Sequence, residues 1–201
     1  MMSSSSDPSP DKQSDRKGRR FSIGGASISV LVTTFLVGSL SWSGFNVALE
    51  WTNTESFCVS CHEMQGNLKE YEESIHDLNR TGVKATCPDC HVPKEFGPKM
   101  YSKVLAAKDI FYHLTGSIDT REKFEAKRLS MAEAVWAKMK QSDSRECRNC
   151  HDVPSMLLEE QEGRAARKHK NMLEINKTCI DCHKGVAHDL PDGYDEDEDQ
   201  G

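Results

Sequence analysis

The pattern of apolar and charged positions divides the chain into four segments. Residues 1–20 are rich in Ser and Pro and end in basic side chains, which predicts a disordered arm. No charged residue occurs from Phe21 to Leu49, and these 29 residues exceed the roughly 20 that a helix needs to cross a bilayer. Residues 50–191 are mostly polar, with short apolar patterns. The last segment, 192–201, is acidic, and because like charges repel one another we expect a disordered tail.

The apolar segment 21–49 predicts a retained membrane anchor. A cleaved signal peptide has an apolar region of about 7 to 15 residues followed by an A-x-A-like site, and this segment is longer and lacks such a site. Trp42 and Trp51 lie at its outer end, where interfacial indoles are expected. Basic residues precede the span, whereas Glu50 and Glu55 follow it. The sequence therefore predicts a single-pass protein with a cytoplasmic N-terminus and an exported domain, which is periplasmic if the cell is a Gram-negative bacterium with an inner membrane.

Two longer patterns predict amphipathic helices within the polar part. Residues 99–114 and 124–140 carry apolar side chains at mostly i, i+4 and i+7 spacings. Within the first helix, Lys103 and Asp109 are polar groups that can hydrogen-bond a quinone carbonyl or accept a quinol proton. A separation of six positions is about 240° around a helix, so the two side chains do not share one face of a regular helix. Two solvated charges on a surface helix remain the alternative interpretation.

The candidate chemistry is carried by four copies of the spacing C-x-x-C-H. Two cysteines three positions apart can each form a thioether to one porphyrin edge, and the histidine that follows is then placed to reach the iron. Zinc sites and redox dithiols also use C-x-x-C, but neither requires a histidine directly after each pair. The motifs use all eight cysteines and predict four covalently bound haem c groups, attached at Cys58, Cys61, Cys87, Cys90, Cys147, Cys150, Cys179 and Cys182.

The spacing of the motifs predicts an internal repeat. Cys58 and Cys87 are 29 positions apart, Cys147 and Cys179 are 32 apart, and 60 positions separate the second motif from the third. About 150 residues around four porphyrins leave few aliphatic side chains for a protein core, so haem must supply apolar mass. We expect a mainly α fold, in which a single N-terminal transmembrane helix precedes a compact multihaem domain of short helices and loops, spanning 50–191 and built from two dihaem units.

Histidine and methionine side chains are the candidate axial ligands. Imidazole is a common haem ligand, and the repeat favours His76, His169 and His188 as distal partners of the motif histidines His91, His151 and His183. His113 either binds an iron or lies beside a haem edge. At the first motif, Met64 lies two residues beyond His62 and either competes for the iron or packs as an ordinary apolar residue.

Together these features resemble the NapC/NirT family of membrane-anchored tetrahaem quinol dehydrogenases. The resemblance covers about residues 20–191 and rests on the anchor and on the motifs C-V-S-C-H-E-M, C-P-D-C-H-V-P, S-R-E-C-R-N-C-H and C-I-D-C-H-K-G-V-A-H. It implies oxidation of quinol at the outer membrane boundary and electron transfer to a soluble periplasmic reductase, most often of nitrate or nitrite. Such a protein takes menaquinol or ubiquinol as its donor.

The resemblance also assigns roles to particular residues. It implies that Met64 binds the first haem and that His62 does not, as in the branch that serves nitrite reductase, and it places Lys103 and Asp109 at the menaquinol site. Some nitrate-linked members have a second histidine in H-V-P-H where this chain has Lys94, so His113 or a partner residue is left to supply one sixth ligand.

Two functions of other classes stay open at this stage: a haem relay that never touches quinone, and a membrane scaffold for a reductase. A homo-oligomer is open as well. The formal net charge of −6 lies largely in the acidic tail, and no nucleic-acid-binding motif occurs.

Overall fold

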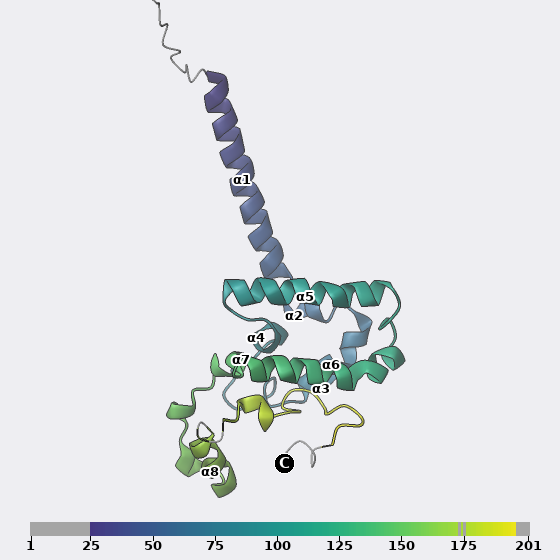
Figure 1. Cartoon of the computed structure of the whole chain (residues 1–201), viewed down its shortest axis with the longest axis vertical. Helices are drawn as coiled ribbons and strands as arrows, with labels where there is room; N and C mark the ends of the chain where they lie inside the picture. The colour runs from purple at the N-terminus through teal and green to yellow at the C-terminus, as the bar shows by residue number, and fades with distance from the viewer. Residues whose placement is uncertain (1–24, 173, 175, 196–201) are drawn as a thin grey trace, which may run out of the picture. The chain divides into compact units, whose positions relative to one another are not determined.

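The computed structural model describes residues 25–172, 174 and 176–195 (Figure 1). The predicted basic arm at 1–20, the first four residues of the predicted span and the tail residues 196–201 lie outside the described residues. The chain divides into two compact units, the first ending at Asn46 and the second beginning at Val47.

The first unit consists of most of helix α1 (Gly25–Trp51). Its stretch Ser27–Trp51 is 25 residues long, has a mean hydropathy of 1.5 and buries no part of its most apolar window. A continuous helix satisfies every internal backbone group, which the hydrocarbon interior of a bilayer demands. This length and composition suit one crossing of a membrane, as the sequence predicts.

The second unit is built from short helices and loops, and no strand occurs among the residues that the structure describes. This confirms the predicted mainly α fold. Besides the last turn of α1, its elements are α2 (Glu55–Cys58), η1 (His62–Met64), α3 (Gln65–Glu72), α4 (Cys87–His91), α5 (Phe96–Leu114), α6 (Arg121–Gln141), α7 (Arg145–Arg148), η2 (Val153–Ser155), η3 (Leu158–Glu160), α8 (Gly163–Asn171) and η4 (Cys179–Asp181).

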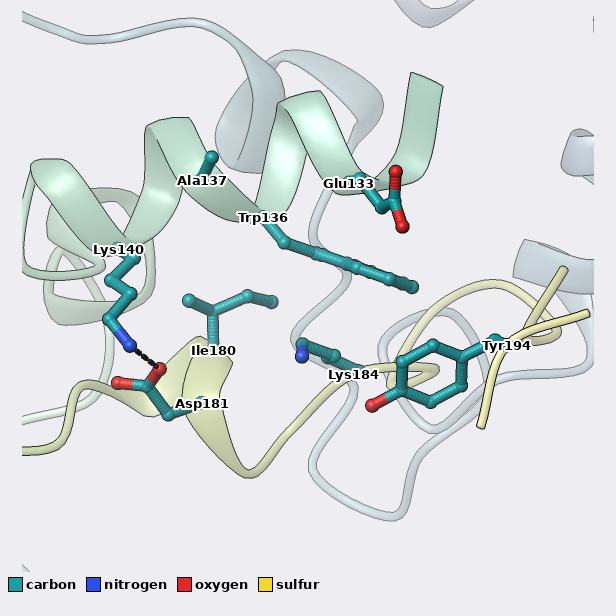
Figure 2. A pocket seen from close by; sticks show the side chains of 8 residues that line it. All are labelled: Glu133, Trp136, Ala137, Lys140, Ile180, Asp181, Lys184 and Tyr194. Carbon is teal, nitrogen blue, oxygen red and sulfur yellow. Dashed lines mark ion pairs between the residues drawn. The ribbon is translucent and has the colours of Figure 1, made fainter. Parts of the chain in front are cut away.

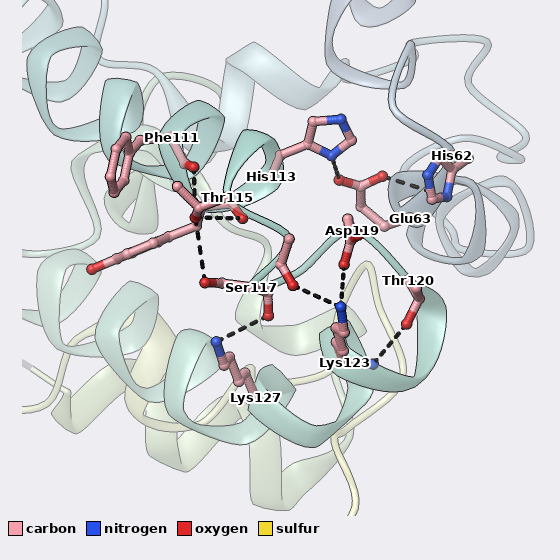
Figure 3. A network of polar contacts seen from close by, with 12 residues as sticks. His62, Glu63, Phe111, His113, Thr115, Ser117, Asp119, Thr120, Lys123 and Lys127 are labelled. Carbon is pink, nitrogen blue, oxygen red and sulfur yellow. Dashed lines mark hydrogen bonds and ion pairs between the residues drawn. The ribbon is translucent and has the colours of Figure 1, made fainter.

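The two long helices, α5 and α6, are joined by a tight turn that reverses the chain (Figure 1). Gly116 has a φ of +73° in this turn, a conformation that L side chains rarely adopt. Lys123 of α6 donates to the Gly116 carbonyl oxygen at 2.7 Å, and the Thr120 hydroxyl caps the start of α6 (Figure 3). Further along, the Lys138 ammonium donates to the buried Ser102 hydroxyl at 2.8 Å, which holds α6 against α5.

Apolar side chains that are fully enclosed by protein are scarce. Five of the described apolar residues are buried, namely Tyr71, Ile118, Phe124, Met172 and Ile180. Burial of apolar surface is the main favourable term in folding. A unit of this size with so small a protein core needs another source of apolar surface, and covalently attached porphyrins can supply it.

Candidate haem sites

The four C-x-x-C-H motifs all lie at short helices. The second motif is α4 itself, and the third begins in α7 with Cys147. In the third and fourth motifs the backbone N–H of the histidine donates to the backbone carbonyl oxygen of the first cysteine. The distance is 2.9 Å for both His151 and His183. One helical turn therefore places both sulfur atoms and the imidazole on the same side of the backbone.

The second and fourth motifs begin with the same capping box. The Thr86 N–H donates to the Asp89 carboxylate at 2.8 Å, and the Thr178 N–H donates to Asp181 at 2.7 Å. Each threonine is followed by Cys-x-Asp-Cys-His, so the aspartate inside the motif fixes the first turn. These two carboxylates hold the two attachment turns in the same conformation.

The attachment cysteines converge in pairs. The thiols of Cys58 and Cys87 are hydrogen-bonded to each other, and the Cys87 contact lowers the pKa of Cys58 to about 7. A second hydrogen bond joins Cys147 and Cys179, and it lowers the pKa of Cys179 to about 6. The first motif thus meets the second and the third meets the fourth, which is the arrangement expected of two dihaem units.

The eight histidines form four face-to-face or edge-on pairs, and each pair joins one motif histidine to one histidine outside the motifs. The ring centroids are 5.9 to 6.3 Å apart. The pairs are His62 with His113, His151 with His76, His91 with His188, and His183 with His169.

Apart from the pair His62–His113, whose rings both face the Glu63 carboxylate, these separations fit an iron held between two imidazoles. A metal–imidazole bond is about 2.0–2.1 Å and the ring centroid lies roughly 1 Å beyond the nitrogen, so two ligands on opposite sides of one metal have centroids roughly 6 Å apart. Burial lowers the pKa of His91 to about 4, and the neutral imidazole that results is the form that binds a metal. The histidine pairs and the attachment cysteines therefore fit covalent haem.

The pairing crosses between the two halves of the repeat. His169 pairs with His183 of its own half, but His76 of the first half pairs with His151 of the second. Likewise the second-half His188 pairs with His91 of the first half. Neither half therefore contains both histidines of the His76–His151 pair, and neither contains both histidines of the His91–His188 pair.

Two of the histidines outside the motifs are oriented by a side chain. The Nδ1 atom of His169 lies 2.6 Å from the Gln161 side-chain oxygen. At the first pair, the Glu63 carboxylate lies between the two rings, 2.5 Å from His113 Nδ1 and 3.6 Å from His62 Nδ1 (Figure 3). A hydrogen bond at one ring nitrogen fixes the ring orientation and leaves the other nitrogen for the metal.

The first site differs from the other three because of this buried carboxylate. The Glu63 side chain is only 3% exposed, and Cys61, Glu63 and His113 bring potential ligand atoms within 4.8 Å of one another. Met64, the predicted ligand, is half-buried in the same short helix. The structure thus brings His113 to the first motif, while Met64 remains adjacent through the chain.

The two predicted quinol residues have different surroundings on α5. The Lys103 ammonium donates to the carbonyl oxygen and to the hydroxyl of Thr52, both at 2.9 Å. Burial lowers the Lys103 pKa, and the thiol of Cys58 is close enough to oppose that shift. Asp109 is exposed at the surface, yet partial desolvation raises its pKa despite the neighbouring Lys108.

A shallow open pocket of ≈ 240 Å³ lies beside the fourth motif (Figure 2). Ile180 and Asp181 of that motif form part of its wall. On its other side, Lys184 lies 4.9 Å from the Trp136 ring and 5.3 Å from the ring of Tyr194, and the two rings contact each other. This contact holds the described part of the predicted tail, 192–195, against α6.

Three residues of the sites escaped the sequence reasoning. Glu63 lies within the motif C-H-E-M, but apart from its charge nothing in the sequence indicated that it belongs to a site. Gln161 lies in an irregular segment with no motif. Arg128 of α6 joins Glu70 to the backbone beside His188, and only the folded chain brings these three together.

The fold and the sites define a class of protein, a single-pass membrane-anchored c-type cytochrome with several haems. Residues 22–193 match the NapC/NirT cytochrome c family, N-terminal region. The chain belongs to this family.

Relatives support the same assignment. The chain is 54% identical over 186 residues to the denitrification system component NirT of Stutzerimonas stutzeri, covering 92% of this chain and 90% of that protein. It is 55% identical over 177 residues to the cytochrome c-type protein NapC of Haemophilus influenzae, covering 88% and 86%. A protein of Allochromatium vinosum named as a tetraheme c-type cytochrome is 49% identical over 165 residues, covering 82% and 90%. No solved structure matches.

Proposed function

We propose that this protein oxidises quinol at the membrane surface and passes the electrons to a periplasmic reductase in nitrate or nitrite respiration. Family membership supports electron transfer to periplasmic reductases by an anchored cytochrome. The name of the relative NirT refers to denitrification. We further propose a cytoplasmic N-terminus, an inner-membrane span and a periplasmic tetrahaem domain at 50–191, with four haem c groups.

The proposed axial ligands are the four histidine pairs. His91 and His188, His151 and His76, and His183 and His169 would hold the second, third and fourth irons. For the first iron we propose His62 and His113, with Glu63 positioning the His113 ring, and we keep Met64 as the alternative ligand to His62. Bound haem would supply one-electron oxidation and reduction at each of these places.

The observation that carries the quinol site is the contact of α5 with the end of the membrane span. Thr52 is the residue directly after α1, and Lys103 donates two hydrogen bonds to it. Lys103 also lies close to Cys58, so the first attachment site is next to the chain that leaves the membrane. Quinol is dissolved in lipid, and an electron acceptor for it must therefore be near this boundary.

Proton transfer is the part of the reaction that side chains must perform. Oxidation of one quinol to quinone releases two electrons and two protons. Asp109, whose pKa is raised, is the proposed acceptor of a proton from the quinol hydroxyl. Lys103 lies about 120° around the continuous helix α5 from Asp109, so it is the proposed donor to the other quinol oxygen. The carboxylate is exposed and can then release the proton to water.

The test is an anaerobic visible spectrum of the detergent-purified holoprotein before and after a menaquinol analogue is added. Rapid partial reduction supports quinol oxidation. Haems that stay oxidised with the analogue but are reduced by dithionite would instead indicate a relay or a scaffold. Asp109→Asn should slow the reduction without changing haem content, whereas Asp119→Asn, which removes an exposed carboxylate paired with Lys123, should not.

A further inference from the structure

Helix α5 carries an apolar stripe on the side that faces away from the haem sites. Met100, Val104, Ala107, Phe111 and Leu114 recur at alternating spacings of four and three. At about 100° per residue, Val104 and Phe111 lie roughly 160–180° around the helix from His113. Figure 3 shows Phe111 and His113 pointing to opposite sides of α5.

The stripe is exposed to an extent that is unusual for large apolar side chains. Val104 is 69% exposed, Phe111 60% and Leu114 77%. The neighbouring α6 is two residues longer, yet none of its described residues is among the exposed large apolar side chains. Contiguous exposed apolar surface marks a contact with a partner or a membrane.

Haem does not account for this exposure. The inward side of α5 is defined by Ser102, which is buried against Lys138, and by His113, which is paired with His62. A haem held by His113 would be bound from that inward side. The stripe, on the opposite side, remains uncovered when the pair holds an iron.

One border of the stripe carries side chains that suit a membrane surface. Tyr101 and Tyr112 lie along one edge and are 65% and 44% exposed, and exposed Lys108 lies on the same flank. Aromatic hydroxyl side chains concentrate at the membrane–water boundary, and lysine can reach from it to water. A helix with an apolar face and such flanks lies in the plane of the interface.

The contact between Lys103 and Thr52 identifies which surface is involved. Trp51 is the last residue of the candidate membrane span, and its ring packs edge-on against Phe57 at 4.9 Å. Lys103 is therefore bonded to the chain at the point where it leaves the lipid. Met100 and Val104 of the stripe lie on either side of Lys103 in the sequence of α5, so the stripe runs past the residue that is bonded to this point of the chain.

We propose that the stripe of α5, Met100 to Leu114, lies in the lipid interface of the bilayer that α1 crosses. The helix then forms a second membrane contact, parallel to the surface, and holds the first attachment motif at the lipid boundary. The inference rests on membrane anchoring and not on quinol oxidation, so the two can fail separately.

Labelling of an introduced thiol tests the proposal. The native cysteines of the holoprotein are joined to haem, so an added cysteine is the one free thiol. Ala107→Cys lies on the stripe, and Ala126→Cys is a matched exposed position on α6. In nanodiscs that hold one copy of the holoprotein, a membrane-impermeant maleimide should label Ala107→Cys at least about tenfold more slowly than Ala126→Cys, because lipid covers position 107.

Each outcome has a defined meaning. Equal labelling of the two thiols overturns the proposal, whatever the quinol activity of the protein. Slow labelling in single-copy nanodiscs supports it, since no second copy is present to cover the stripe. If Ala107→Cys is labelled rapidly in single-copy discs but is protected and cross-linked in detergent at high protein concentration, the stripe binds a second copy and the lipid assignment is wrong. Full labelling of both variants in denaturant shows that each thiol is free.

Discussion

Replacing Arg128 of α6 should disturb the proposed haem site at His188 through a network of hydrogen bonds. Arg128 donates to both carboxylate oxygens of Glu70 in α3, one of them at 2.8 Å, and to the backbone oxygen of Asp189 at 2.9 Å. The Asp189 N–H in turn donates to Glu70 at 3.1 Å. These bonds tie α3 and α6 to the residue directly after His188, the partner of His91.

Arg128→Met keeps much of the side-chain volume and removes the charge. The Arg128 and Glu70 side chains are 13% and 14% exposed, so the variant leaves a mostly buried carboxylate without its main partner. Breaking a buried ion pair costs about 3–5 kcal/mol. Glu70 keeps the Asp189 N–H and has Arg121 at 3.9 Å, which reduces our expected loss to about 2–3 kcal/mol of unfolding free energy.

Two measurements on the purified holoprotein check this reasoning. Denaturant unfolding followed by circular dichroism should show the loss of stability. Electron paramagnetic resonance should show a new high-spin ferric signal from one of the four proposed haems, because the segment that carries the proposed ligand His188 is released. Glu125→Gln removes a weak neighbour of Arg128, at 3.5 Å, and a partly exposed ion pair with Arg121, and it should change neither signal. Unchanged stability and an unchanged low-spin spectrum in Arg128→Met would refute the proposed role of the network.

Three further predictions concern ligands and pH. His76→Ala and His188→Ala should each convert one of four haems to high spin, and the double variant should convert two, as counted by electron paramagnetic resonance. Met64→Leu should leave the low-spin spectrum of the first haem unchanged if His62 is the ligand, and loss of a thioether signal would show that Met64 binds the iron. Burial raises the Tyr71 pKa to about 12, so wild type should lose stability as the pH rises from about 10 to 12, by at most about 2–3 kcal/mol. In denaturant unfolding, the stability of Tyr71→Phe should not fall in this way between pH 10 and 12. The variant also loses the hydrogen bond from the tyrosine hydroxyl to the Ala85 carbonyl oxygen.

The sequence predicts what local chemistry dictates. C-x-x-C-H spacing follows from the reach of two thioethers on one porphyrin, and a charge-free run follows from bilayer thickness. The expected helices at 99–114 and 124–140 are present as α5 and α6, each longer by a few residues at its start. The class of fold and the family therefore needed no tertiary contact to be inferred.

Contacts between distant segments could not be predicted in the same way. His76 and His169 occupy similar places in the two repeats, which suggests equivalent partners. The structure pairs His169 within its own half and His76 across the halves, because pairing depends on packing and not on spacing. The two long helices show a second limit, since their apolar periods are alike while only α5 exposes its large apolar side chains. Periodicity identifies an apolar face but not what covers it.

The crossing of the histidine pairs has a consequence for how this fold is held together. On the proposed ligation, the second haem is attached by cysteines of the first half and takes His188 from the second half. The third haem is attached in the second half and takes His76 from the first. Each central haem would then be a cross-link between the halves, fixed covalently on one side and by a metal bond on the other.

Such cross-links would explain how a unit with five buried hydrophobic core residues among its described residues can keep one structure. Contacts between apolar side chains are weak individually, and a small core cannot fix the relative position of two halves. An iron–imidazole bond fixes that position through a single group. It also follows that neither half can complete its central haem site alone, so attachment of haem to both halves must precede or accompany their final packing. On the proposed ligation, the bonds that define the electron-transfer sites would therefore also be the main tertiary restraints of the domain.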